Sequence, residues 1–159
     1  MHLSPARRAT TSLPIIQSNS KTSTSGPDIL KEGIMYVQYN PNPSRKLTGD
    51  CVIRAITKVT NSDWKSVYMN IALQGYMMDD MPSSNAVWGA YLYSNGFNRY
   101  IIPNTCPACY TVKDFCRDNP KGTYLLATGS HVIAVKDGDY YDSWDSGDEI
   151  PIYYWRKET

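Results

Sequence analysis

The chain has 159 residues, 42% apolar side chains and a formal net charge of +1, which is enough material for one globular domain with its own core. The near-neutral charge gives no electrostatic reason to expect nucleic acid or an anionic membrane as a partner. No run of residues approaches the roughly 18–20 continuous apolar positions that span a bilayer. We therefore expect neither a nucleic-acid nor a membrane partner.

The N-terminal segment differs in composition from the rest of the chain. Residues 1–27 contain no acidic side chain and are rich in serine and threonine. Such a segment cannot bury enough apolar surface to offset the entropy lost on ordering it. We expect residues 1–30 to be a disordered tail or leader and residues 31–159 to be the folded domain. Arg7, Arg8 and the lack of acidic residues leave an organellar transit peptide as an alternative.

The first half of the folded part predicts helices after one short strand at residues 35–39. Apolar residues at positions 52, 53, 55, 56 and 59 follow a helical period. Asp50 is a suitable N-cap for this helix, so Cys51 is expected in its first turn. Further helices are expected after caps at Ser62, at residue 84 or 85, and at Thr111.

The last third of the chain predicts strands at residues 123–128, 132–135 and 140–144, with Asp137-Gly138 as the hairpin turn between the last two. Residues 150–155 are expected to close the sheet, and the proline within them favours an edge position. Helices followed by an antiparallel sheet predict an α+β fold, with N-terminal helices packed on a C-terminal sheet.

Four cysteines, Cys51, Cys106, Cys109 and Cys116, occur without a secretory signal, which favours reduced thiols and a cytoplasmic location. The last three offer thiolates of the kind that zinc binds, but a fourth ligand is missing nearby. A redox role for Cys106 and Cys109 requires their motif to open a helix, whereas the predicted helix starts later, at Thr111. We expect these cysteines to be structural, with no metal and no other cofactor.

Cys51 and His131 are the candidate reactive pair. A cysteine reacts as the thiolate, which a helix N-terminus and a neighbouring imidazolium both stabilise. The chain has only two histidines, and His2 lies in the predicted tail, so His131 is the candidate base. A cysteine in the first turn of a helix is more often a small buried apolar residue, so the hypothesis depends on the pair.

The predicted hairpin beyond His131 brings two carboxylates within reach of its ring. A two-residue turn sets His131 opposite Trp144, and one extra residue in a bulge sets it opposite Asp145. Asp142 is a diagonal neighbour in either case. The group that orients the imidazole is therefore Asp142 or Asp145, and the hairpin alone does not choose. Trp144 is expected to form a wall of the substrate cleft.

The order of these residues resembles that of papain-like cysteine peptidases. In that superfamily a cysteine at a helix N-terminus precedes a histidine that opens a strand and an Asp or Asn on the next strand. The chain is most similar in style to small members such as Josephin-type deubiquitinating domains and bacteriocin-processing peptidases. Their third residue lies farther past the histidine than Asp142 lies past His131 and is followed by a small residue or proline, which Asp145, followed by Ser146, matches better. The resemblance therefore implies Asp145 as the orienting residue.

Residues 49–56, 131–135 and 141–147 also resemble a group of papain-like proteins from bacteria and their phages. This implies action in the cytoplasm, that of a bacterial host if the chain is phage-encoded. The chain departs from papain itself, because Arg45 stands where papain-like enzymes carry the glutamine that donates to the oxyanion.

Oxyanion donors must therefore come from elsewhere. The backbone N–H of Cys51 is one candidate, together with a side-chain amide from Gln38, Asn40 or Asn42. Asn42 is favoured because its proline-flanked turn fixes its backbone near the start of the helix.

The resemblance implies a cysteine peptidase or amidase that hydrolyses a peptide or isopeptide bond in a peptide or protein substrate. Cys51 attacks the carbonyl, His131 transfers protons and Asp145 orients His131. A cell-wall cysteine amidase is an alternative, because an Asp-Cys pair at a helix start also occurs in bacterial cell-wall endopeptidases. A non-catalytic peptide- or protein-binding module of phage or bacterial origin, such as a counter-defence protein, is another.

Overall fold

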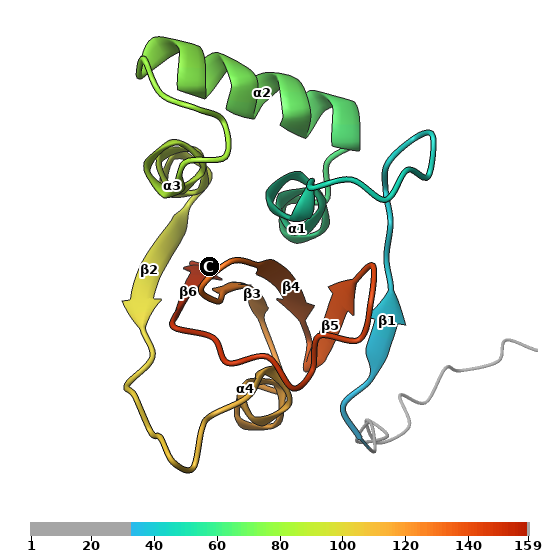
Figure 1. Ribbon diagram of the computed structural model, residues 1–159, viewed down its shortest axis with the longest axis vertical. Helices are drawn as coiled ribbons and strands as arrows, with labels where there is room; N and C mark the ends of the chain where they lie inside the picture. The colour runs from blue at the N-terminus through green and yellow to red at the C-terminus, as the bar shows by residue number, and fades with distance from the viewer. Residues whose placement is uncertain (1–32, 159) are drawn as a thin grey trace, which may run out of the picture. The chain divides into compact units, whose positions relative to one another are not determined.

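The computed structural model describes residues 33–158, and the predicted tail at residues 1–30 lies outside them. The described part of the chain forms four helices and one six-stranded sheet (Figure 1). The helices are α1 (Cys51–Thr60), α2 (Trp64–Met77), α3 (Asn85–Ser94) and α4 (Val112–Asp118). The strands are β1 (Tyr36–Gln38), β2 (Phe97–Ile101), β3 (Thr123–Ala127), β4 (Val132–Lys136), β5 (Asp139–Asp142) and β6 (Tyr153–Lys157). The predicted α+β class is confirmed.

The strand order in the sheet is β1-β5-β4-β3-β6-β2. β1 runs parallel to β5, and the other neighbours pair antiparallel. The β4–β5 hairpin turns at Asp137 and Gly138, whose φ angles of 51° and 81° both lie in the left-handed region. A two-residue hairpin turn with positive φ at both positions matches the twist of its strands, so the predicted turn is confirmed.

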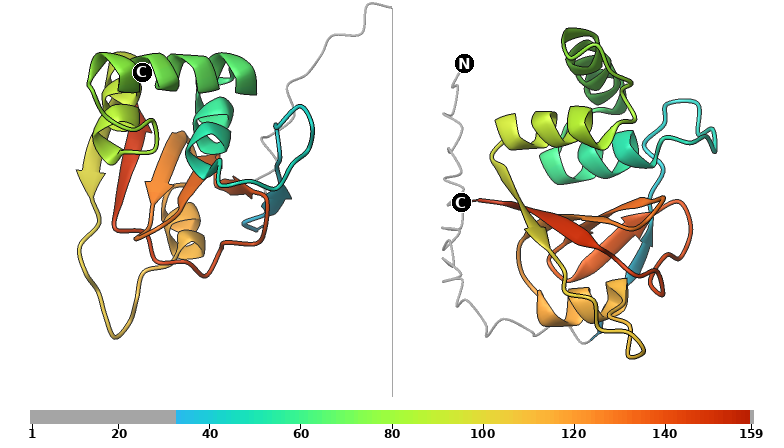
Figure 2. Two further views of the ribbon diagram at one scale, coloured as in Figure 1. Left: turned by 45° about the horizontal axis from the view of Figure 1, so that its top comes forward. Right: turned by 60° about the vertical axis from the view of Figure 1, so that its left-hand side comes forward.

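The sheet is covered on both faces. Helices α1, α2 and α3 lie over one face and α4 over the other (Figures 1 and 2). Alternate side chains of β3 serve the two layers: Leu125 and Ala127 pack into the first core, and Tyr124 and Leu126 into the second. This period of two is what a strand between two layers requires.

Helix α1 is anchored to β3 and β4 by its apolar face. Ile56, at the centre of that face, is 0% exposed, and complete burial of such a side chain contributes about 1.5–3 kcal/mol. The helix ends at Asn61, which adopts a left-handed conformation and whose N–H donates to the Lys58 carbonyl. The packing of α1 fixes the place of its first residue, Cys51.

The structure corrects the expected edge of the sheet. The sequence pattern does not indicate β2, which pairs with β6 and forms one edge. The strand expected at residues 150–155 therefore lies inside the sheet. It begins only at Tyr153, so Pro151 precedes it and its missing N–H breaks no ladder hydrogen bond.

The second helix begins one residue later than expected. Its N-cap is Asp63 instead of Ser62, and the Asp63 carboxylate accepts a hydrogen bond from the Ser66 N–H at 3.0 Å. The predicted Thr111 cap of α4 is confirmed, with a reciprocal bond between Thr111 and Asp114.

The cysteines differ from the expected reduced set. Cys106 and Cys109 are joined by a disulfide, while Cys51 and Cys116 are free. Within residues 33–158 no three His, Cys, Asp or Glu side chains are grouped to hold a metal ion. No helix of this same region is both long and apolar enough to cross a bilayer.

Candidate active site

Cys51 is the first residue of α1, as predicted, but Asp50 does not cap the helix with its side chain. The Asp50 backbone, at φ −104° and ψ 23°, lies outside the extended conformation usual for a capping residue. Its carboxylate instead accepts hydrogen bonds from Arg54 Nη1 at 2.5 Å and from Trp64 Nε1 at 2.9 Å. The negative charge next to Cys51 is therefore compensated by a guanidinium.

The turn before β4 presents His131. The hydroxyl oxygen of Thr128 accepts the His131 N–H at 3.1 Å, and the Thr128 N–H donates to the His131 carbonyl at 2.9 Å. These bonds tie the two ends of the four-residue turn together. The His131 side chain lies just before the first residue of β4, with 14% of its surface exposed.

Asp142, the last residue of β5, is the carboxylate that holds His131. Its Oδ2 lies 2.5 Å from Nε2 of the imidazole, and its side chain is 1% exposed. The other oxygen, Oδ1, accepts the Ser143 N–H at 2.7 Å. Burial alone would raise the pKa of Asp142, but the hydrogen bond and charge of His131, together with further hydrogen bonds that include the Ser143 N–H, outweigh it and the pKa is lowered.

The assignment of this position to Asp145 is wrong. The β4–β5 register runs without a bulge from Lys136↔Asp139 to Ala134↔Tyr141. Beyond these paired residues, the ring centroids of His131 and Trp144 are 5.4 Å apart. Asp145 lies one residue farther on, where its Oδ1 accepts from the Tyr140 hydroxyl at 2.5 Å. The bulge that would bring Asp145 to His131 is not formed.

Cys51 and His131 line the same cavity, and each shifts the pKa of the other. Burial raises the pKa of the Cys51 thiol, but a hydrogen bond and charge from His131, the Val132 N–H and the charge of Arg54 together lower it below its ordinary value of 9.0. Because Asp142 occupies Nε2, the ring nitrogen left for the sulfur is Nδ1.

Whereas the pKa of Cys51 is lowered, that of His131 is raised. Burial lowers it, but the hydrogen bonds to Asp142 and Cys51 prevail and raise it from 6.5 to about 9. A lowered thiol pKa beside a raised imidazole pKa favours a thiolate–imidazolium pair near neutral pH.

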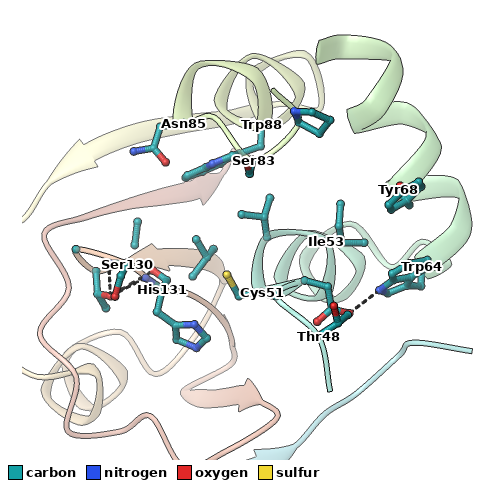
Figure 3. A pocket seen from close by; sticks show the side chains of 18 of the residues that line it. Thr48, Cys51, Ile53, Trp64, Tyr68, Ser83, Asn85, Trp88, Ser130 and His131 are labelled. Atoms are coloured by element: carbon teal, nitrogen blue, oxygen red, sulfur yellow. Dashed lines mark hydrogen bonds between the residues drawn. The ribbon is translucent and has the colours of Figure 1, made fainter. Parts of the chain in front are cut away.

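A cavity of about 540 Å³ opens onto this pair. Figure 3 shows Cys51 and His131 beside each other, with the side chains of Ser83, Asn85 and Trp88 across from them. Four aromatic residues contribute to the lining: Trp64, Tyr68, Trp88 and Tyr153. Cys51 and His131 thus lie in a concave site whose wall combines aromatic and polar side chains, as is usual for ligand sites.

Trp144 does not line this cavity, although its ring lies next to that of His131. It is 46% exposed and covers the imidazole from outside. Trp144 therefore covers His131 and does not form the expected cleft wall, to which both the helices and the sheet contribute.

The expected oxyanion amides do not line the cavity either. Nε2 of Gln38 donates to the Ser143 carbonyl at 3.1 Å, and Oδ1 of Asn42 accepts the Ser44 N–H at 3.0 Å. The side-chain amide that does line the cavity is that of Asn85, at the start of α3. The Cys51 N–H, in the first turn of α1, has no acceptor within its own helix.

Sequence reasoning assigned no role to Arg54, which contacts both Asp50 and Asp142. One signal was present: Asp50 and Arg54 are four residues apart at the start of a helix, the spacing at which opposite charges meet. The contact with Asp142, 88 positions away along the chain, has no local signal.

No protein-family model, curated protein or solved structure matches the chain. Its chemistry is therefore read from the arrangement of Cys51, His131 and Asp142.

Proposed function

We propose that the chain is a papain-like cysteine hydrolase that cleaves a peptide or isopeptide bond. The observation that carries the proposal is the imidazole of His131, which is bound through Nε2 to a buried carboxylate and lies beside Cys51 in the same cavity, where each residue shifts the pKa of the other. A nucleophile, its base and a third group that orients the base are the parts that acyl transfer requires. The order of helices and sheet also agrees with the papain-like proteins that the sequence resembles.

The reaction begins with the Cys51 thiolate. Its sulfur forms a bond to the carbonyl carbon, and the π electrons move to the carbonyl oxygen, which becomes an oxyanion. The unpaired N–H of Cys51 and the positive end of the α1 dipole stabilise this charge. Asn85 is the candidate second donor on the opposite wall of the cavity.

His131 then acts as the acid. The proton on Nδ1 passes to the leaving nitrogen, the C–N bond breaks, and the thioester remains on Cys51. In the second half of the reaction His131 takes a proton from water, and the resulting hydroxide attacks the thioester carbonyl. The thiolate leaves, and the imidazolium is restored, so protons and electrons balance over the cycle.

Asp142 supports both acylation of Cys51 and hydrolysis of the thioester. A carboxylate on Nε2 keeps a proton at that nitrogen, which leaves Nδ1 as the nitrogen that gives and takes protons at the sulfur. It also stabilises the positive charge that the imidazole carries while the thiolate attacks. Its own burial excludes water that would compete for Nε2.

The shape of the cavity points to a peptide substrate with a large apolar side chain near the scissile bond. Trp64, Tyr68 and Trp88 line the cavity together with Tyr153, and Trp64 and Tyr68 stack with ring centroids 5.2 Å apart. Aromatic walls gain most from an apolar or aromatic partner.

The test is hydrolysis of a fluorogenic peptide library by the purified chain, with Cys51→Ala as the matched variant. The proposal expects release of fluorophore by the wild type, with preference for apolar residues, and none by Cys51→Ala at an unchanged unfolding temperature. Digestion of purified peptidoglycan in parallel separates a peptidase from a cell-wall amidase. A biological activity that Cys51→Ala retains in full would instead indicate a non-catalytic binding module.

A further inference from the structure

Arg54 is a buried cation, 5% exposed, near the start of α1. Burying a guanidinium is costly unless it is paired and hydrogen-bonded. Arg54 has two carboxylate partners: Nη1 donates to Asp50 Oδ1 at 2.5 Å, and Nη2 to Asp142 Oδ1 at 3.2 Å. These two acids are 6% and 1% exposed. One guanidinium thus joins the residue before the thiol to the carboxylate behind the imidazole.

We infer that Arg54 is a positioning residue, which fixes the orientation of the Asp142 carboxylate so that Oδ2 faces His131. The importance of Arg54 for catalysis rests on the proposed function. The orientation of the Asp142 carboxylate does not, and it can be measured without any substrate.

The geometry at Asp142 carries the inference. Oδ1 receives two donors, Nη2 of Arg54 and the Ser143 N–H. With Oδ1 held from two sides, Oδ2 can point only toward the ring of His131, which it reaches at 2.5 Å. The terminal torsion of an aspartate is broad, so without Arg54 the Oδ1 atom keeps the Ser143 N–H and loses its charged partner.

The other end of the network reaches the wall of the cavity. Trp64, which lines the cavity, donates its Nε1–H to Asp50 Oδ2 at 2.9 Å. Asp50 in turn holds the second arm of the guanidinium. Contacts therefore run from the cavity wall through Asp50 and Arg54 to Asp142 and the ring.

A lysine cannot replace this arrangement. The guanidinium is a planar fork whose separate N–H groups reach two acceptors in fixed directions, whereas an ammonium is a point charge on a flexible stem. Arg54→Lys therefore keeps the positive charge and removes the two directed N–H groups. The variant distinguishes an effect of hydrogen-bond geometry from an effect of charge.

The readout is the pKa of His131 measured by NMR. The chain has only two histidines, so a His2→Gln background leaves one imidazole signal to titrate. The charged groups that act on this ring are Cys51 from α1 and Asp142 from β5, and Arg54 reaches it only through its contact with Asp142.

Positioning predicts that Arg54→Lys lowers the pKa of His131 by about one unit or more, toward its ordinary value, because the bond to Asp142 is weakened. A role as charge alone predicts no change, and that result overturns the inference. Arg117→Lys, an exchange at an exposed arginine that pairs with Asp114 on α4, is the matched control and should leave the pKa of His131 unchanged.

A second measurement covers the case in which Arg54→Lys does not fold. In the wild-type chain with ¹⁵N-labelled arginine, a guanidinium held by two carboxylates cannot rotate freely. Arg54 should therefore show separate Nη proton signals. A single averaged Nη signal overturns the inference. Neither measurement uses hydrolysis, so a chain without peptidase activity can still show that Arg54 positions Asp142, and an active chain can show that it does not.

Discussion

Nε2 of His131 and Oδ2 of Asp142 are 2.5 Å apart, and Asp142 belongs to the strand next to the one that His131 opens. Because Nε2 makes this contact, Nδ1 is the ring nitrogen that remains for the sulfur of Cys51. A single hairpin therefore sets the orientation of the proposed base, and α1 brings the proposed nucleophile to the same cavity.

Exchanging Asp142 should abolish most of the activity. Asp142→Asn keeps the shape of the side chain but removes the charge that balances the imidazolium and can present an amide N–H to Nε2, which selects the wrong tautomer. By the behaviour of triads in general, we expect kcat to fall by about 10²–10⁴-fold. The measurement is steady-state hydrolysis of the best peptide found in the library.

Asp145→Asn is the matched control for that prediction. Its carboxylate accepts from the Tyr140 hydroxyl and the Gly147 N–H, away from His131, so kcat should stay near that of the wild type. A larger loss in Asp145→Asn than in Asp142→Asn would show that the orienting carboxylate has been wrongly assigned.

Cys51 should react with iodoacetamide at pH 7 far faster than Cys116. The pKa of Cys51 is lowered by His131 against the effect of burial, whereas burial raises the pKa of Cys116 to about 12. The thiolate is the nucleophile, so we expect a difference of at least about tenfold. Peptide mapping by mass spectrometry at short times measures both rates.

His131→Ala provides the comparison for this labelling. Removing the imidazole takes away the hydrogen bond and the charge that favour the Cys51 thiolate, so labelling of Cys51 at pH 7 should slow. The rate at Cys116 should not change. Labelling of Cys51 that is indifferent to His131→Ala contradicts an interaction between the two side chains.

The pH profile of kcat/KM should be bell-shaped. The pKa of His131 is raised to about 9, so the imidazolium that protonates the leaving nitrogen is present below that pH and lost above it. The pKa of Cys51 is lowered from 9.0, so the thiolate forms at a lower pH and sets the acidic limb. The two limbs belong to the coupled pair and not to either residue alone.

In Asp142→Asn the basic limb should move toward lower pH, because one of the hydrogen bonds that raises the pKa of His131 is gone. A basic limb that stays near pH 9 in this variant would assign that limb to another group.

The position of Cys51 depends on the packing of α1. Ile56→Ala removes a side chain that is 0% exposed at the centre of the first core, and we expect a loss of about 2–5 kcal/mol in the free energy of unfolding. Leu47→Ala, at a residue that is 80% exposed, should change stability by less than about 0.5 kcal/mol. Denaturant unfolding followed by tryptophan fluorescence measures both, and equal effects would contradict the assignment of this core.

Local signals were sufficient to select Cys51 and His131, which the structure places in one cavity. The apolar period of α1 placed Cys51 at a helix start, and the small number of histidines left His131 as the base. The choice between Asp142 and Asp145 depended on whether the hairpin contained a bulge, which no residue pattern specified. The resemblance pointed to Asp145, and the unbroken register places Asp142 at the ring instead.

Other features had no local signature because they depend on tertiary contacts. β2 (Phe97–Ile101) contains Asn98 and Arg99 in its middle, so it does not show the apolar alternation of a strand. It is recognised only by its pairing with β6. The contact between Arg54 and Asp142 likewise exists only because α1 packs against the strands.

The most direct test of the proposed nucleophile is to trap the acyl group. The wild-type chain is mixed with a p-nitrophenyl ester of an apolar peptide, quenched in acid while the thioester is stable, and mapped by mass spectrometry. The account predicts the acyl mass on Cys51, with much slower acylation in His131→Ala. A folded wild-type chain that acquires no acyl group on Cys51, or that acquires it equally fast without His131, would contradict it.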